Sequence, residues 1–218
     1  MTNVESFLAE LDAQNAAALE RIATGAAREP AMEVTVARLL GLALKNELEA
    51  TECAAMWIAS TPEVDVKLAL ARQAGDEAKH FRLIADRLAA LGAPVDVAAY
   101  QAGPRSPLLA YLASLEGTVE RVAAGQFTRE ALAVVRNEEF IRFCEARGDG
   151  ETAALYRDVV QPDETHHHAL GRKLLARLAT DEPSQGRARA AAKRTLELAE
   201  ELQEIARLKL GVSRAPGC

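Results

Sequence analysis

The sequence contains few aromatic residues and almost no segments with the pattern of a β-strand. Phe, Trp and Tyr make up 4% of its 218 residues, and runs in which apolar and polar residues alternate are nearly absent. Alanine, leucine, glutamate and arginine, which favour helices, dominate instead. We therefore predict an all-α fold. We also expect a single domain over residues 1–218, because no stretch in the middle of the chain has the composition of a long flexible linker.

Cysteines are few, and long apolar runs are missing. The three cysteines, Cys53, Cys144 and Cys218, lie far apart, and none belongs to a Cys-x-x-Cys pair, which fits reduced thiols. No apolar run approaches the roughly 20 residues of a membrane-spanning helix, and the acidic, amphipathic N-terminus lacks the pattern of a signal peptide. We therefore expect a cytoplasmic protein that does not associate with a membrane.

The chain has more acidic than basic residues, with a formal net charge of −6. This balance argues against a broad nucleic-acid surface. A local basic group near the C-terminus is interpreted as the solvated face of a helix; it consists of Arg187, Arg189, Lys193 and Arg194. RNA stays open as a partner, although the net charge does not support it.

Proline, glycine and capping residues divide the chain into helical segments. The fourth segment is expected to break near Gly125, with Thr128 capping its second part, and Pro162 is expected to bend the fifth. Thr61 is predicted to cap the third segment, and 92–107 is predicted to be irregular. The predicted helices are 3–24, 32–60, 62–91, 107–147, 151–179 and 187–210.

One short motif occurs twice, in the second helix of each of two predicted hairpins, 32–91 and 129–179. The sequence reads Asp-Glu-Ala-Lys-His at 76–80 and Asp-Glu-Thr-His-His at 163–167. Residues three apart share one face of a helix. Each motif therefore can direct a glutamate and a histidine, Glu77 with His80 and Glu164 with His167, at one ion. Both pairs lie on apolar stripes, where a divalent metal is the simplest compensation for a buried carboxylate.

Two metal ions require further carboxylates, one from each of the other two helices of a bundle. Glu47 is the best candidate in the second segment because its neighbours at helical spacing are apolar, and Glu52 is the second choice. In the fourth segment Glu138 is preferred, with Glu139 as the alternative. Glu145 is a more remote candidate.

The order of these motifs resembles the ferritin-like di-iron carboxylate superfamily over about residues 45–170, and most nearly its tRNA hydroxylase and rubrerythrin-like branches. The resemblance implies a ferritin-like four-helix bundle with its core at about 32–179 and with extra N- and C-terminal helices. It also implies two iron ions as the cofactor, with manganese as the alternative. The ligands carried over are Glu47, Glu77, His80, Glu138 (or Glu139), Glu164 and His167.

The resemblance assigns a supporting role to the aspartate before each motif glutamate. By analogy with the relatives, Asp76 would orient His167, and Asp163 would orient His80. The relatives often have an arginine just before the histidine, where this chain has lysine or histidine, so their salt-bridge network is left open. Tyr156, two turns before Glu164, is a speculative redox residue, with a structural core tyrosine as the alternative reading.

The function implied by the resemblance is that of a non-heme di-iron oxidoreductase that activates O₂, and we expect a monooxygenase or hydroxylase. The substrate is not identified by the sequence. The alternatives are a ferroxidase or rubrerythrin-like peroxide-scavenging iron protein, and a metal-free helical scaffold. The implied partners are O₂ or peroxide, a substrate, and an electron donor such as a ferredoxin or a reductase; a homodimer is left open.

Overall fold

The computed structural model describes residues 3–26, 34–98, 104–210 and 215–217. These residues form helices joined by short connections, with no β-strand among them, so the all-α prediction is confirmed. The elements η1 and η2 are π-helical. The helices are α1 (Asn3–Ala26), α2 (Val36–Ser60), α3 (Val64–Ala90), α5 (Pro107–Ala113), α6 (Thr118–Arg121), η1 (Val122–Arg129), α7 (Glu130–Ala146), α8 (Gly150–Leu155), η2 (Tyr156–Val160), α9 (Gln161–Leu178) and α10 (Glu182–Leu210).

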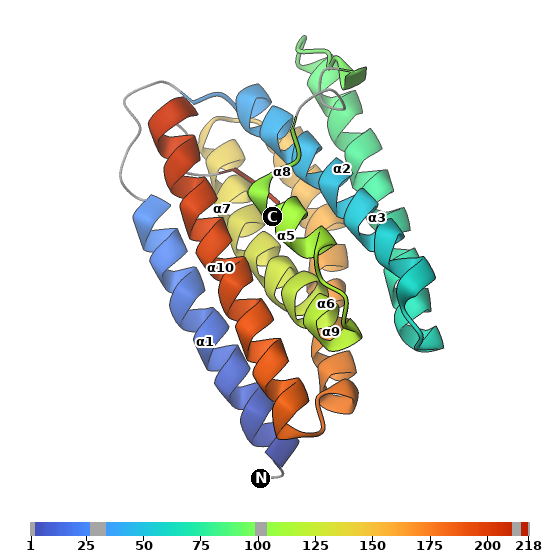
Figure 1. The fold of residues 1–218 in the computed structure, drawn as a ribbon. Coiled ribbons are helices and arrows are strands. Elements are labelled where there is room, and N and C mark those ends of the chain that lie inside the picture. Colours follow the sequence, from blue (N-terminus) through green and yellow to red (C-terminus); the bar gives the residue numbers. More distant parts are fainter. Residues whose placement is uncertain (1–2, 27–33, 99–103, 211–214, 218) are drawn as a thin grey trace.

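Four long helical rods form the centre of the molecule (Figure 1). Helices α2 and α3 make one antiparallel hairpin, while the continuous runs α6–η1–α7 and α8–η2–α9 make the second. Helices α1 and α10 lie side by side along one flank, and α10 also packs on η1. This arrangement is compatible with a ferritin-like bundle that carries additional N- and C-terminal helices.

The structure corrects two predicted helix boundaries. Thr61 does not cap α3; it ends α2, because its backbone N–H and its hydroxyl both donate to the carbonyl of Trp57, at 3.1 and 2.8 Å. The expected break near Gly125 is also wrong, since the chain stays helical there as η1, and Thr128 is buried rather than a cap. The break in the predicted segment lies earlier, between α5 and α6.

Two further expectations concern Pro162, whose bend stays a prediction, and the segment before α10. Pro162 lies in the first turn of α9, and the π-helical turn η2 directly precedes α9. Pro162 has no backbone N–H, so it cannot donate the hydrogen bond that another residue would donate in a continuous α-helix. The predicted loop at 180–186 is mostly the first turn of α10, which begins at Glu182.

A layer of buried polar residues separates the two larger apolar clusters of the interior. One cluster packs around Trp57, Phe127 and Leu175, and the other around Leu44 and Tyr156. On each of the four central rods, the polar residues of the layer fall between the stretches that supply the two clusters. The layer therefore crosses the middle of the bundle, with apolar side chains above and below it.

Candidate metal centre

Six acidic and histidine side chains from the four central rods meet in this layer. Two sets of four offer ligand atoms that all lie within 4.8 Å of one another, and Glu77 and Glu164 belong to both sets. Each set could hold a metal ion. The first set is Glu47, Glu77, His80 and Glu164; the second is Glu77, Glu130, Glu164 and His167.

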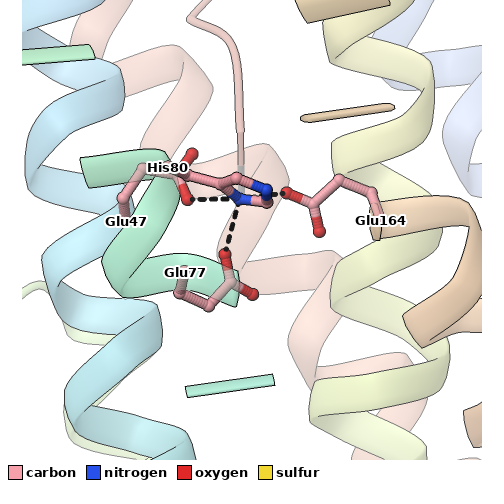
Figure 2. Close-up of side chains that lie close together, drawn as sticks. All are labelled: Glu47, Glu77, His80 and Glu164. Carbon is pink, nitrogen blue, oxygen red and sulfur yellow. Dashed lines mark hydrogen bonds and ion pairs between the residues drawn. The ribbon is translucent and has the colours of Figure 1, made fainter. Parts of the chain in front are cut away.

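The first set surrounds the Nδ1 atom of His80 (Figure 2). This nitrogen lies 3.5 Å from Glu47 Oε2, 3.3 Å from Glu77 Oε2 and 3.7 Å from Glu164 Oε1. The carboxylates come from α2, α3 and α9, and all three point at the imidazole between the helices. Oxygen and nitrogen atoms converge here from three directions, as coordination of one ion requires.

The second set surrounds the Nδ1 atom of His167 in the same way. This nitrogen lies 3.5 Å from Glu164 Oε2, 3.8 Å from Glu77 Oε1 and 3.9 Å from Glu130 Oε2. Glu77 and Glu164 thus present one oxygen to each histidine. Either carboxylate could therefore hold an ion together with His80 or with His167.

The outer nitrogen of each histidine contacts an aspartate from the opposite hairpin. His80 Nε2 lies 3.1 Å from Asp163 Oδ2, and His167 Nε2 lies 3.1 Å from Asp76 Oδ2. These are the two contacts that the family resemblance implies. An aspartate accepts the Nε2–H of a neutral imidazole, which leaves Nδ1 free to bind an ion.

Basic side chains of α3 form salt bridges with the two aspartates. Lys79 Nζ lies 2.5 Å from Asp163 Oδ2 and 3.8 Å from Asp76 Oδ1, and Arg72 pairs with Asp76 at 3.3 Å. Although partial burial works in the opposite direction, hydrogen bonds from Lys79 and His80 lower the pKa of Asp163. A lysine thus supplies the salt bridges here, whereas His166 is exposed.

The glutamate from the fourth segment is Glu130, and this corrects the expectation of Glu138 or Glu139. Glu130 is fully buried, whereas the Glu138 side chain is 59% exposed and lies 3.8 Å from Arg142. Glu139 is partly buried and lines a small pocket. Neither residue belongs to the cluster. Glu52, the second choice in the second segment, and Glu145, the more remote candidate in the fourth, are exposed.

Sequence reasoning missed Glu130 because a helix start was expected at Thr128. An acidic residue in a first turn already has an explanation, its interaction with the helix dipole. The chain instead continues through η1, and Glu130 faces the interior one α-helical turn before Ala133 and two before Asn137. Phe127 and Ala133, three residues before and after Glu130, are buried apolar residues, but they form one stripe with it only if the helix is continuous through Thr128.

Gln73 is a second residue that sequence reasoning missed. Its side-chain amide donates to Glu130 Oε1 at 2.6 Å and to Glu77 Oε1 at 3.5 Å, and it is buried on α3 one turn before Glu77. Gln73 therefore satisfies the oxygen of Glu130 that faces away from His167. Its role is to orient this carboxylate.

Close helix contacts position the ligands on the second hairpin. A Cβ atom on Gly171 would come within 2.7 Å of the backbone of Gln126 and Phe127, so α9 lies directly on η1. On the other side of η1, a Cβ atom on Gly125 would lie 2.8 Å from the ring of Trp57. His168 also donates from Nδ1 to the carbonyl of Phe127 at 2.7 Å, since a carbonyl can only accept.

Two of the buried carboxyl groups, those of Glu77 and Glu164, bind protons more tightly than usual when no metal ion is present. Burial and the neighbouring Glu130 raise the pKa of Glu77 to about 8, and burial with two neighbouring carboxylates raises that of Glu164 well above its usual value. Burial opposes the charging of the histidines, but their carboxylate partners raise the pKa of His80 to about 11 and of His167 to about 9. The cluster therefore attracts positive charge strongly.

The donor set passes a simple test of fit to metal ions. Among the described residues, Glu130 Oε2 and Glu164 Oε2 face no hydrogen-bond donor as long as both carboxyls are ionised, and His167 Nδ1 has acceptors only at 3.5 Å or beyond. A proton on Glu164 can bridge to Glu130, whose pKa is lowered, against its burial, to about 2. A cation can satisfy all three atoms at once.

Tyr156 lies in the apolar cluster next to this layer. Its ring packs edge-on against Phe140 with a centroid distance of 4.8 Å, it is fully buried, and burial raises the pKa of its hydroxyl well above the usual value. The hydroxyl has no hydrogen-bond partner among the described residues. A redox role for Tyr156 stays a prediction.

The site is thus a buried carboxylate–histidine cluster at the centre of an all-helical bundle. No protein-family model, curated protein or solved structure was found to match the chain. Within the described ranges, no helix combines the length and the apolar character that crossing a membrane requires.

Proposed function

We propose that this chain is a non-heme di-iron oxidoreductase that activates O₂, most nearly a monooxygenase or hydroxylase. The observation that carries the proposal is the pair of four-residue ligand sets that share Glu77 and Glu164. A single structural ion needs only one such set. Two overlapping sets, with the shared carboxylates turned to both histidines, support a centre of two neighbouring ions.

The chemistry of the donors supports iron, with manganese as the alternative. Four carboxylates and two imidazoles form an oxygen-rich ligand set that suits Fe²⁺, Mn²⁺ and Zn²⁺. Four ionised carboxylates balance the charge of two divalent ions, so a loaded centre carries no net charge in this dry interior. The proton-holding groups of the cluster would release their protons when ions bind.

Each residue of the centre has a role that follows from its position. Glu47 and His80 would hold one ion, Glu130 and His167 the other, and Glu77 with Glu164 would span both. The aspartates and Gln73 orient these ligands, and the apolar clusters on both sides exclude water. A pair of reduced iron ions supplies the electrons that O₂ activation requires.

Metal content is the first test of the proposed function. Protein loaded with Fe²⁺ under anaerobic conditions and freed of excess metal should hold two ions per chain. Less than half an ion per chain, with full helicity retained, would rule out the centre. The Glu77→Gln variant, which removes a shared ligand, should lose both ions while its circular dichroism spectrum stays unchanged.

A ferroxidase or peroxide scavenger is the second candidate, because the six ligands are at most 2% exposed. Such burial favours small reactants. Excess Fe²⁺ and O₂ distinguish the candidates: a ferroxidase oxidises many Fe²⁺ ions per chain, whereas an oxygenase stops after its own two ions until an electron donor is added. Hydrogen peroxide consumption by the reduced protein tests the scavenger.

A further inference from the structure

The C-terminal tail returns to the middle of the bundle, beside the metal centre. Of the described tail residues, Ala215 is partly buried, and Pro216 and Gly217 are buried. Tails of this kind usually extend into solvent unless specific contacts hold them, so the contacts of these residues require an explanation.

Two asparagines hold one peptide group of the tail from opposite sides. Asn46 Nδ2 donates to the carbonyl of Pro216 at 3.2 Å, and the N–H of Gly217 donates to Asn137 Oδ1 at 2.8 Å. Both tail atoms belong to the peptide bond between Pro216 and Gly217. Asn46 lies on α2 and Asn137 on α7, so the tail bridges the two hairpins.

The buried amide of Asn137 depends on this contact. Asn137 is fully buried, and its Nδ2 has no hydrogen-bond partner among the described residues. Its Oδ1 accepts from the tail. If the tail left and no water replaced it, both polar atoms of this side chain would be unsatisfied in the interior, which is unfavourable.

The held peptide group lies against one of the metal-centre carboxylates. A Cβ atom on Gly217 would stand 3.3 Å from Glu47 Oε1 and 3.6 Å from the Cβ of Asn46. The backbone of Gly217 has φ +75°, a conformation that other residues rarely adopt. Glycine therefore lets the tail approach the outer oxygen of Glu47, while the other oxygen faces His80.

We propose that Asn46 and Asn137 form a binding site for the chain's own C-terminal peptide, and that residues 215–217 dock there as a strap over the Glu47 side of the metal centre. The docked strap slows the passage of ions and small reactants between the cluster and solvent. The docking stands on the contacts alone, whereas its effect on ions rests on the proposed function.

The Gly217→Ala variant tests the strap, with Gly92→Ala as its matched control. Gly92 has nearly the same backbone conformation, φ +74°, but a Cβ atom there has no neighbour within 4 Å. Both variants therefore carry the same backbone strain, and only the first places a methyl group against Glu47. A chain ending at residue 214 gives a second way to remove the strap.

Amide exchange measures docking without any metal. In metal-free, uniformly ¹⁵N-labelled protein, the amide of residue 217 should be protected from exchange in the unaltered chain and in Gly92→Ala, and unprotected in Gly217→Ala. A Gly217 amide that exchanges at the rate of a free peptide in the unaltered chain would overturn the proposal, whatever the metal content.

The rate of metal release measures how strongly the docked strap restricts access to the metal centre. The half-time for transfer of bound Fe²⁺ to a chelator should fall by about tenfold or more in Gly217→Ala and in the shortened chain, as expected for the loss of the two hydrogen bonds that hold the strap. Added Ala-Pro-Gly-Cys peptide should restore slow release in the shortened chain. Equal release rates with full metal content would overturn the strap. Absence of metal from every variant would refute the proposed function, and the amide exchange would still decide the docking.

Discussion

Replacing Glu130 by glutamine should remove one ion of the proposed pair and leave the other in place. Glu130 belongs to only one of the two ligand sets, the one that contains His167. The set around His80 keeps all four of its residues in the variant, whereas the set around His167 loses a carboxylate. The metal content should therefore fall from two ions per chain to one.

The size of the effect follows from the position of the carboxylate. Loss of a residue that only orients a ligand weakens metal binding by about 10–100-fold, and loss of a direct, charged ligand should exceed the upper end of that range. We expect the second ion to bind more than about 100-fold more weakly, or by about 3 kcal/mol. Gln73 can still donate to the new amide oxygen, as it does to Glu130 Oε1 at 2.6 Å, so the fold should persist.

The assay is metal content by mass spectrometry after anaerobic loading, followed by competition with a chelator. Glu138→Gln is the matched control, because it makes the same chemical change eight residues further on, at an exposed ion pair with Arg142. An exposed pair of this kind contributes about 0.5 kcal/mol or less, so this variant should keep both ions. The reasoning is refuted if Glu130→Gln keeps two ions, or if Glu138→Gln loses one.

Three further predictions follow from the contacts around the centre. Alanine at Asp76 or Asp163 should weaken metal binding by about 10–100-fold, because each histidine loses the acceptor that orients it; chelator competition measures this. Metal-free protein should unfold at lower temperature as the pH rises from about 5 to 8, because the folded pKa of Glu77, about 8, exceeds its unfolded value and the folded state therefore binds more protons in this range. Gly171→Ala should destabilise the protein by about 1–3 kcal/mol, since the methyl group meets the η1 backbone at 2.7 Å; urea unfolding measures this.

Each of these has its own control. Alanine at Asp65, which pairs with Arg177 on the surface, should leave metal affinity unchanged. The pH trend should weaken when divalent ions replace the protons, and a metal-free protein that gains stability between pH 5 and 8 would contradict it. Gly186→Ala in α10, where a Cβ atom has open space, should leave stability unchanged or raise it slightly.

The proximity of the two residues within each motif could be predicted from the sequence because helical geometry alone relates them. Glu77 and His80 lie three residues apart on one helix, and so do Glu164 and His167, which places each pair on one face without knowledge of any partner helix. Glu47 could be selected because apolar residues surround it at helical spacing. The structure brings these five side chains together.

The remaining carboxylate could not be found with the same rule. Prediction assumed a new helix near Thr128, but the π-helical turns of η1 continue the rod and place Glu130 inside. In this arrangement Gly171 packs against the backbone of η1, and Trp57 packs against Gly125 of η1. Such a shift depends on packing between distant segments, and no local pattern of apolar residues specifies it.

Residue types and helical spacing thus suffice to predict an all-helical chain with two Glu-x-x-His pairs directed inward. Three features depend on the tertiary structure: the choice of Glu130 over Glu138, the contact of Lys79 with Asp163, and the return of Gly217 to Glu47. The physical reason is that a helix relates residues three or four positions apart, whereas contacts between residues far apart in the sequence arise only when the helices pack.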